Sequence, residues 1–427
     1  MPKAHGHEFS CDGRERAGAA GRRSVLKGAS LAAISAALGA AIPFGRFMPE
    51  GYIPVALAQD GALDFPGKSS DLVVIGDKPL VAETPAHLLD DDVTPTEVHY
   101  IRNNGQIPEP PADPDAWQIT IDGEVNSPLE LTLGELKSRF ENGTYDLVLE
   151  CGGNGRSQFV PAARGNPWTT GGVGCARWSG VRLKDVLEAA GPKPAAIYTA
   201  HYGADPHLSG DPEKHALSRG IRLEKAMEPH TLVAFAMNGE PLPPIHGAPV
   251  RLLVPGWSGS ASQKWLTRIQ LRDREHDGQG MKGTSYRVPV VPIVPGTDHD
   301  GAGFAILESM PVKSLITSPA DGTRAPAGTT EVDVQGHAWA GDLTVQDVFV
   351  SIDFGQTWQP TDLEDPVNRY AWQRWSTKVT LPTEGYYEIW ARAVDSDGKS
   401  QPFTAPNWNP GGYGGNAYHR IAILVEA

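Results

Sequence analysis

The sequence predicts an α+β domain with a mixed sheet, followed by an all-β, immunoglobulin-like sandwich domain. Three observations favour this fold class. Short apolar segments with strand-like alternation recur along most of the chain, whereas two stretches have helical spacing. The 48 glycines and 37 prolines favour short strands and turns over long helices. From about residue 310 onward the pattern is strand-like throughout, with Gly, Asp and Pro turns spaced as in a sandwich.

The first 58 residues have the features of an export signal. A twin arginine, Arg22 and Arg23, precedes a run of small apolar residues from Ala29 to Ile42. The small residues Ala56 and Ala58 fit a cleavage site. The run is too short and too weakly apolar for a stable membrane span, with an uncleaved anchor as the alternative. Because twin-arginine signals export folded, cofactor-loaded proteins, we expect a periplasmic protein.

Length and charge limit the domain organisation and the partners. The 427 residues suffice for two to three domains, and we expect a signal over 1–58, a first domain over 59–305 and a second domain over 306–427. The net charge of −14 argues against nucleic acid as a partner. An acidic surface instead favours a basic soluble partner, attracted by electrostatic steering.

Secondary-structure signals follow in chain order. Residues 59–114 are polar and rich in proline, which predicts an extended arm. Thr132 and Glu135 have the spacing of a helix cap, and Gly191 is a helix stop. A loop of Pro and Val over 288–295 separates the two domains. We predict helices starting at 132 and over 181–191, and strands at 117–121, 145–149, 197–200, 231–235, 250–254, 331–335, 348–352, 378–381 and 388–394.

The segment Leu149–Arg156 carries the strongest chemical signal. Cys151 ends an apolar stretch and is followed by a Gly-Gly-Asn-Gly turn and an arginine. Backbone N–H groups and a cation stabilise a thiolate, which serves as a nucleophile or a metal ligand. The alternative is a buried cysteine that packs as a small apolar side chain. A disulfide to Cys175 is a further alternative, disfavoured by the different contexts of the two cysteines.

Three other clusters carry polar side chains in loops. Tyr100–Asn104 holds a cation and two amides, His246–Arg251 spans a turn and a strand start, and Pro255–Trp265 is a loop of small residues ending in hydroxyl, amide and ammonium groups. Each alone is also typical of an ordinary loop. The sequence lacks a phosphate-binding Gly-Lys-Ser/Thr loop, a His-Glu-x-x-His motif and a Cys-x-x-Cys-His haem attachment. A serine hydrolase is weakly supported, because Gly256–Ser260 departs from the nucleophile-elbow pattern.

Taken together and in order, these motifs resemble the sulfite oxidase family of molybdenum enzymes. The resemblance runs from about Tyr100 to the C-terminus, and residues 203–214 carry a closer likeness to bacterial periplasmic sulfite dehydrogenases. Further matching segments are Pro167–Trp168, Ala176–Leu183, Met237–Pro243, Lys264–Leu266 and Asn416–Arg420.

The resemblance implies a role for each matching position. Cys151 would be the thiolate bound to molybdenum. The sulfite pocket would contain Arg102, Arg156, Arg164 and Trp168. The pterin and its phosphate would contact Tyr100, Ile101, Arg102, Asn103, Asn104, Asp205, His246, Arg251, Ser262, Gln263 and Lys264.

The chain departs from the family pattern at three places, of which the first is Asn104, where many members have histidine. Animal members have a tyrosine where this chain has Met281, and Tyr286 is a candidate to supply that hydroxyl. An arginine found in animal members is missing from Asn409–Gly412, so the third cation of the pocket is unassigned.

The resemblance also implies the overall activity. We expect one molybdenum–molybdopterin and no haem in this chain, and oxidation of sulfite to sulfate, with electrons passed singly to a separate c-type cytochrome. We further expect a homodimer formed through the C-terminal domain, without stable membrane insertion. The alternatives are a sulfane dehydrogenase or sulfoxide reductase on the same scaffold, and a catalytically silent binding protein.

Overall fold

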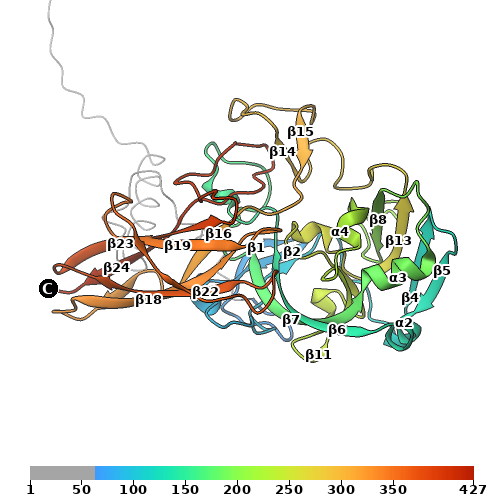
Figure 1. Ribbon diagram of the computed structural model, residues 1–427, viewed down its shortest axis with the longest axis horizontal. Coiled ribbons are helices and arrows are strands. Elements are labelled where there is room, and N and C mark those ends of the chain that lie inside the picture. Colours follow the sequence, from blue (N-terminus) through green and yellow to red (C-terminus); the bar gives the residue numbers. More distant parts are fainter. Residues whose placement is uncertain (1–62) are drawn as a thin grey trace, which may run out of the picture. The chain divides into compact units, whose positions relative to one another are not determined.

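The computed structural model describes residues 63–427, which are mostly β-strands with few short helices (Figure 1). The predicted signal over 1–58 lies outside the described residues. Within 63–427 no helix has the length and apolar character needed to cross a membrane.

The segment predicted as an extended arm instead contains a small sheet. Strands β1 (Val73–Asp77), β2 (Leu80–Glu83) and β3 (Ile101–Arg102) pair antiparallel. The side chains of Val81 and Ile101 are fully buried. The arm prediction was wrong because the apolar residues between the prolines pack against the rest of the chain, as Ile101 does against Ile245.

Two five-stranded sheets follow. The long strands β6 (Asn142–Glu150) and β7 (Val173–Arg182) lie side by side and pair antiparallel (Figure 1). The last residue of β6, Glu150, is thereby paired with Val173. In the second sheet β13 runs parallel to β4 and antiparallel to β8, which confirms the predicted mixed sheet. The first sheet contains β6 (Asn142–Glu150), β7 (Val173–Arg182), β10 (Leu232–Met237), β11 (Glu240–Pro241) and β12 (Arg251–Leu253); the second contains β4 (Gln118–Gly123), β5 (Leu129–Thr132), β8 (Tyr198–Gly203), β9 (Gly220–Arg222) and β13 (Leu266–Arg272).

Short helices pack against these sheets. The helix α2 (Leu133–Arg139) begins with the predicted cap, in which Thr132 and Glu135 satisfy each other's backbone N–H groups. The helix α3 (Leu183–Ala190) ends at Gly191, whose φ of 67° favours glycine. It starts two residues later than predicted, because Val181 and Arg182 belong to β7 and pair with Val233 and Leu232 of β10. The other short helices are α4 (Leu223–Ala226) and the 3-10 turns Ala86–Leu88, Pro114–Ala116, Arg156–Gln158, Pro244–His246 and Gly259–Ala261.

The loop predicted over 288–295 is observed from residue 290 onward, and it forms part of the connection of a short hairpin. The strands β14 (Arg287–Pro289) and β15 (Phe304–Ile306) pair antiparallel. The loop that joins them exposes Val290, Val291 and Val294.

The C-terminal part consists of two sheets that share one apolar core. Trp375 is fully buried in that core, which both sheets contribute to. The four strands predicted here are confirmed. One sheet contains β16 (Lys313–Ser318), β18 (Glu331–Trp339), β21 (Asp362–Leu363) and β22 (Gln373–Thr380); the other contains β17 (Thr323–Ala325), β19 (Val345–Ser351), β20 (Gln359–Pro360), β23 (Gly385–Asp395) and β24 (His419–Val425).

Candidate active site

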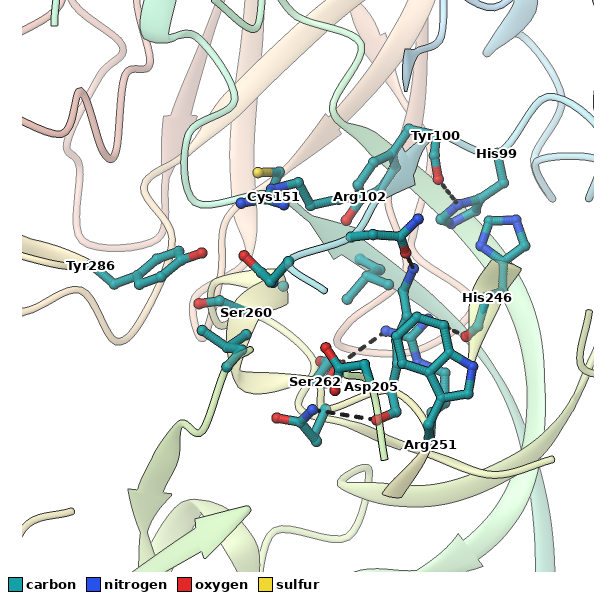
Figure 2. Close-up of a pocket in the computed structure, with 18 residues that line it drawn as sticks. His99, Tyr100, Arg102, Cys151, Asp205, His246, Arg251, Ser260, Ser262 and Tyr286 are labelled. Carbon is teal, nitrogen blue, oxygen red and sulfur yellow. Dashed lines mark hydrogen bonds between the residues drawn. The ribbon is translucent and has the colours of Figure 1, made fainter. Parts of the chain in front are cut away.

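A cavity, with about 630 Å³ of empty space when its solvent-open mouth is included, brings most of the predicted site residues together (Figure 2). Its walls come from the loops after β3, β6 and β8, from β12, and from the turn that follows β12. The predicted residues that line it are Tyr100, Arg102, Asn103, Asn104, Cys151, Asp205, His246, Arg251, Ser262, Gln263 and Lys264.

Four predicted residues do not line this cavity. Ile101 is fully buried in the small N-terminal sheet, and Trp168 is buried against the ring of Tyr100, with 5.8 Å between ring centres. Arg156 lies behind the wall and donates hydrogen bonds to backbone oxygens. Arg164 does not join the others: its side chain is 74% exposed and pairs with Asp298. Both arginines follow Cys151 closely in the sequence, so residue type and spacing do not distinguish them. The structure does, because Arg156 is buried near the cysteine turn and Arg164 is exposed to solvent.

Cys151 follows β6 directly and its thiol is free. Its backbone N–H donates to the carbonyl of Gly172 at 2.8 Å, and its carbonyl accepts from the N–H of Asn154 at 2.9 Å. Cys175 is also free and lies within β7, opposite Val148, so the disulfide alternative is excluded in this structure. Burial raises the pKa of Cys175 to about 12. The two cysteines therefore differ in kind, since only Cys151 opens onto the cavity.

A buried carboxylate anchors the cysteine loop. Glu150 is 2% exposed and accepts hydrogen bonds from Asn154 Nδ2 at 3.0 Å and from Trp339 Nε1 at 2.8 Å. It also pairs with Lys313, whose ammonium donates to the carbonyl of Asn154 at 3.0 Å. Lys313 and Trp339 belong to β16 and β18. The C-terminal sheets therefore fix the position of the residue next to Cys151.

One side of the cavity concentrates buried cations. The Lys264 ammonium donates to Asn103 Oδ1 and to the carbonyl of Ile245, both at 2.7 Å. Arg251 donates to the carbonyls of His246 and Ser262 at 2.9 and 3.1 Å. Burial lowers the pKa of Lys264 well below its usual value, and that of Arg251 to about 10. Desolvation therefore disfavours both charges in the absence of an anion.

A second layer of titratable groups supports this side. Lys68, from the segment before β1, places its ammonium 3.1 Å from His246 Nε2. Burial lowers the pKa of Lys68 to about 7 and holds those of His99 and His246 well below 6.5. The carboxylate lining the cavity is Asp205, and burial raises its pKa to about 7. The ionisable side chains in and around the cavity are thus mostly basic, and burial disfavours the charged forms of several of them.

Two tyrosines complete the wall, and only one of them, Tyr286, was a candidate from the sequence. Tyr286 lines the cavity, and Figure 2 shows its hydroxyl pointing inward on the side of Cys151 and Ser260. Its ring stacks on Tyr413, with 4.8 Å between ring centres. Tyr413 gave no signal in the sequence, because the contact joins loops more than a hundred residues apart.

Comparisons with known proteins match the N-terminal and C-terminal parts of the chain to two family models. Residues 104–280 match the family described as "Oxidoreductase molybdopterin binding domain", and residues 305–426 match "Mo-co oxidoreductase dimerisation domain". The mitochondrial sulfite oxidase of Rattus norvegicus is 35% identical over 398 residues, which cover 89% of this chain and 71% of that protein. The chain belongs to the sulfite oxidase family of molybdenum enzymes. The predicted family is thereby confirmed.

Other relatives of the sulfite oxidase family show how widely its activities range. The sulfite oxidase of Gallus gallus is 34% identical and covers 88% of this chain and 83% of its own. A nitrate reductase of Hordeum vulgare is 32% identical, covering 78% of this chain and 39% of that enzyme. The crystal structure of the sulfane dehydrogenase SoxCD from Paracoccus pantotrophus matches with a TM-score of 0.69 at 24% identity, covering 90% of this chain and 99% of that one. That structural match shows the fold.

The cavity fits the anionic cofactor that the family implies. Arg102, Arg251 and Lys264 line it without an ion pair to any carboxylate of the described chain. One guanidinium nitrogen of Arg102, Nε of Arg251 and Oε1 of Gln263 are buried with no hydrogen-bond partner in residues 63–427. Buried polar atoms are ordinarily satisfied. The two guanidinium nitrogens therefore require acceptors with negative charge, which a cofactor phosphate and an oxyanion substrate supply. The Gln263 oxygen requires a donor, which the N–H groups of a pterin supply.

Proposed function

We propose that this protein binds molybdenum–molybdopterin in the cavity and oxidises sulfite to sulfate. The observation that carries the proposal is the free thiol of Cys151, which opens onto a cavity whose cations form no ion pair with a carboxylate of residues 63–427. The 35% identity to a mitochondrial sulfite oxidase over most of both chains supports sulfite as the substrate.

Different residues of the cavity bind the cofactor and the substrate. The bound cofactor supplies oxygen-atom transfer and a sink for two electrons. Lys264 and Arg251 hold its phosphate by charge-assisted hydrogen bonds. The Cys151 thiolate ligates the metal, and its loop is held in place through Glu150. Burial of these groups keeps water away from the charges and strengthens their interactions.

Sulfite is a small oxyanion, and its oxidation with one water releases two electrons and two protons. Arg102 lines the cavity with an unsatisfied buried nitrogen, and this group binds the substrate oxygens. Arg156 approaches from behind the cysteine turn, where a Cβ on Gly153 would collide with its guanidinium. The glycine therefore permits the close approach of Arg156 to the turn.

The setting of the enzyme belongs to the same proposal. The twin-arginine segment supports export to the periplasm, and the acidic charge supports a basic c-type cytochrome as the acceptor of single electrons. The match to a dimerisation domain supports a homodimer, and the paired C-terminal sheets support an immunoglobulin-like class for that domain. Light scattering on the exported protein tests the dimer, with twice the chain mass expected.

Assays of the purified, molybdenum-loaded protein test the function. We expect stoichiometric molybdenum and sulfite-dependent reduction of ferricyanide and of a c-type cytochrome. Arg102→Met should raise the sulfite KM at least about tenfold, because a charge-assisted contact is lost. Arg177→Met is the matched control, since Arg177 lies exposed on β7 and pairs with Asp146. Turnover of a sulfane-sulfur compound or of nitrate, without sulfite turnover, would contradict the proposal.

A further inference from the structure

Arg219 is a buried guanidinium without a carboxylate partner. It immediately precedes β9, and its side chain is 1% exposed. One terminal nitrogen donates to Ser260 Oγ at 3.1 Å, while Nε has no hydrogen-bond partner in the described chain. No ion pair involving Arg219 occurs within residues 63–427. A buried cation is costly unless other groups compensate it, so its position calls for a cause.

The neighbours of Arg219 are residues of the cavity wall. Its guanidinium carbon lies 4.5 Å from the centre of the Tyr286 ring, which is the geometry of a cation–π contact. Ser260, which accepts its hydrogen bond, also lines the cavity. Figure 2 shows Ser260 and the Tyr286 hydroxyl on the same side of the cavity as Cys151. Arg219 therefore does not line the cavity itself but contacts two side chains that do, Ser260 and Tyr286.

The contacts continue from Tyr286 to a second arginine. The Tyr286 ring stacks on Tyr413 with 27° between the ring planes. The guanidinium of Arg156 lies 5.3 Å from the centre of the Tyr413 ring. The order of contacts is thus Arg219, Tyr286, Tyr413 and Arg156. These residues come from four separate segments, which restrains the Tyr286 ring on more than one side.

The backbone of Tyr286 shows why such restraint is needed. Its φ of 49° lies in the left-handed region, which a bulky side chain adopts at a cost. Such a conformation persists only where the surroundings impose it. The ring contacts with Arg219 and Tyr413 are surroundings of this kind.

We propose that Arg219 is a positioning residue that holds the Tyr286 hydroxyl in the cavity and thereby sets the affinity of the site for an oxyanion. The inference rests on the proposed function for the identity of the substrate, sulfite. Its own content is narrower: without Arg219, Tyr286 leaves the wall and anion binding weakens.

Sulfate binding to the loaded enzyme tests this inference independently of turnover. We expect Arg219→Met to raise the sulfate Kd about tenfold by calorimetric titration, as for one lost polar contact to an anion. The sulfite KM should rise by a similar factor with kcat little changed, since ground-state and transition-state binding fall together. Arg222→Met is the control, because Arg222 is exposed on β9 and pairs with Glu308. Circular dichroism and molybdenum content verify that each variant is folded and loaded.

A double-mutant cycle tests whether the effect passes through Tyr286. Tyr286→Phe should weaken sulfate binding as Arg219→Met does, and the double variant should bind no worse than either single variant. Additive losses, or an unchanged sulfate Kd in Arg219→Met, would overturn the inference. If the wild type binds sulfate but does not oxidise sulfite, the proposed function fails, whereas non-additive losses in sulfate affinity still support the role of Arg219.

Discussion

At the scale of the residue, burial and partner choice distinguish chemically similar side chains. Cys151 and Cys175 are both free and buried, yet only Cys151 has a neighbouring cavity with cations. Similarly, Arg102 lines that cavity, whereas Arg164 is solvent-exposed and paired with Asp298. Residue type and spacing alone do not separate these cases, because burial depends on contacts that are distant in sequence.

Replacing the candidate metal ligand tests its role directly. Cys151→Ser should keep the fold and lose at least about 100-fold in molybdenum-dependent turnover, because a hydroxyl is a poor substitute for a thiolate ligand. Turnover and molybdenum content are measured together with thermal unfolding. Cys175→Ser is the control: it should retain turnover although its site in β7 is buried. Normal turnover in Cys151→Ser would refute the assignment.

The raised pKa of Asp205 predicts a dependence of stability on pH. A carboxylate whose folded pKa is about 7 binds a proton more tightly folded than unfolded. Stability of the cofactor-free protein should therefore fall as pH rises from about 4 to 7, by up to about 4 kcal/mol. Asp205→Asn should remove this contribution, as measured by urea unfolding at pH 5 and pH 8. An identical pH dependence in both proteins would contradict the buried-carboxylate explanation.

At the scale of the element, one strand end connects the two parts of the chain. Glu150 ends β6, and its partners Lys313 and Trp339 come from β16 and β18. The geometry of the cysteine turn thus depends on sheets that begin more than 150 residues later. A helix cap such as that of Thr132 and Glu135 is different, because its partners are local and could be predicted from sequence.

Removing the lysine of this link should destabilise the protein. Lys313→Met leaves the Glu150 carboxylate buried without its cation, at a cost of about 3–5 kcal/mol in the free energy of unfolding. Adding Glu150→Gln should recover part of that loss, since the uncompensated charge is then removed. Lys378→Met, which breaks an exposed pair with Glu331, should change little. Equal unfolding free energies for Lys313→Met and the wild type would show that the link is dispensable.

At the scale of the whole molecule, the basic side chains of the cavity form no ion pair that would compensate their charge within residues 63–427. They are held by backbone carbonyls and neutral side chains, and desolvation lowers the pKa values of Lys264 and Arg251. A ligand that binds only the folded state stabilises that state by mass action. The cofactor is therefore expected to contribute to folding stability as well as to chemistry.

Comparison of loaded and cofactor-free protein tests this expectation. The loaded form should be more stable by at least about 3 kcal/mol, seen as a higher midpoint of thermal unfolding. Lys264→Met should reduce the difference between the two forms, because a contact to the phosphate is lost. Scanning calorimetry of the four samples provides the measurement. Coincident midpoints of loaded and cofactor-free wild type would contradict an anion-dependent site.

The amino-acid sequence by itself determined the family, the strand-rich fold, the cysteine turn and most of the cavity lining, because these depend on local patterns and on ordered motifs. The tertiary structure decided which arginines reach the cavity, paired Glu150 with Lys313, and stacked Tyr286 between Arg219 and Tyr413. It also showed that the segment predicted as an extended arm contains the strands β1, β2 and β3. The physical reason is common to all of these: burial and ion pairing are set by segments that meet only after the sheets have formed.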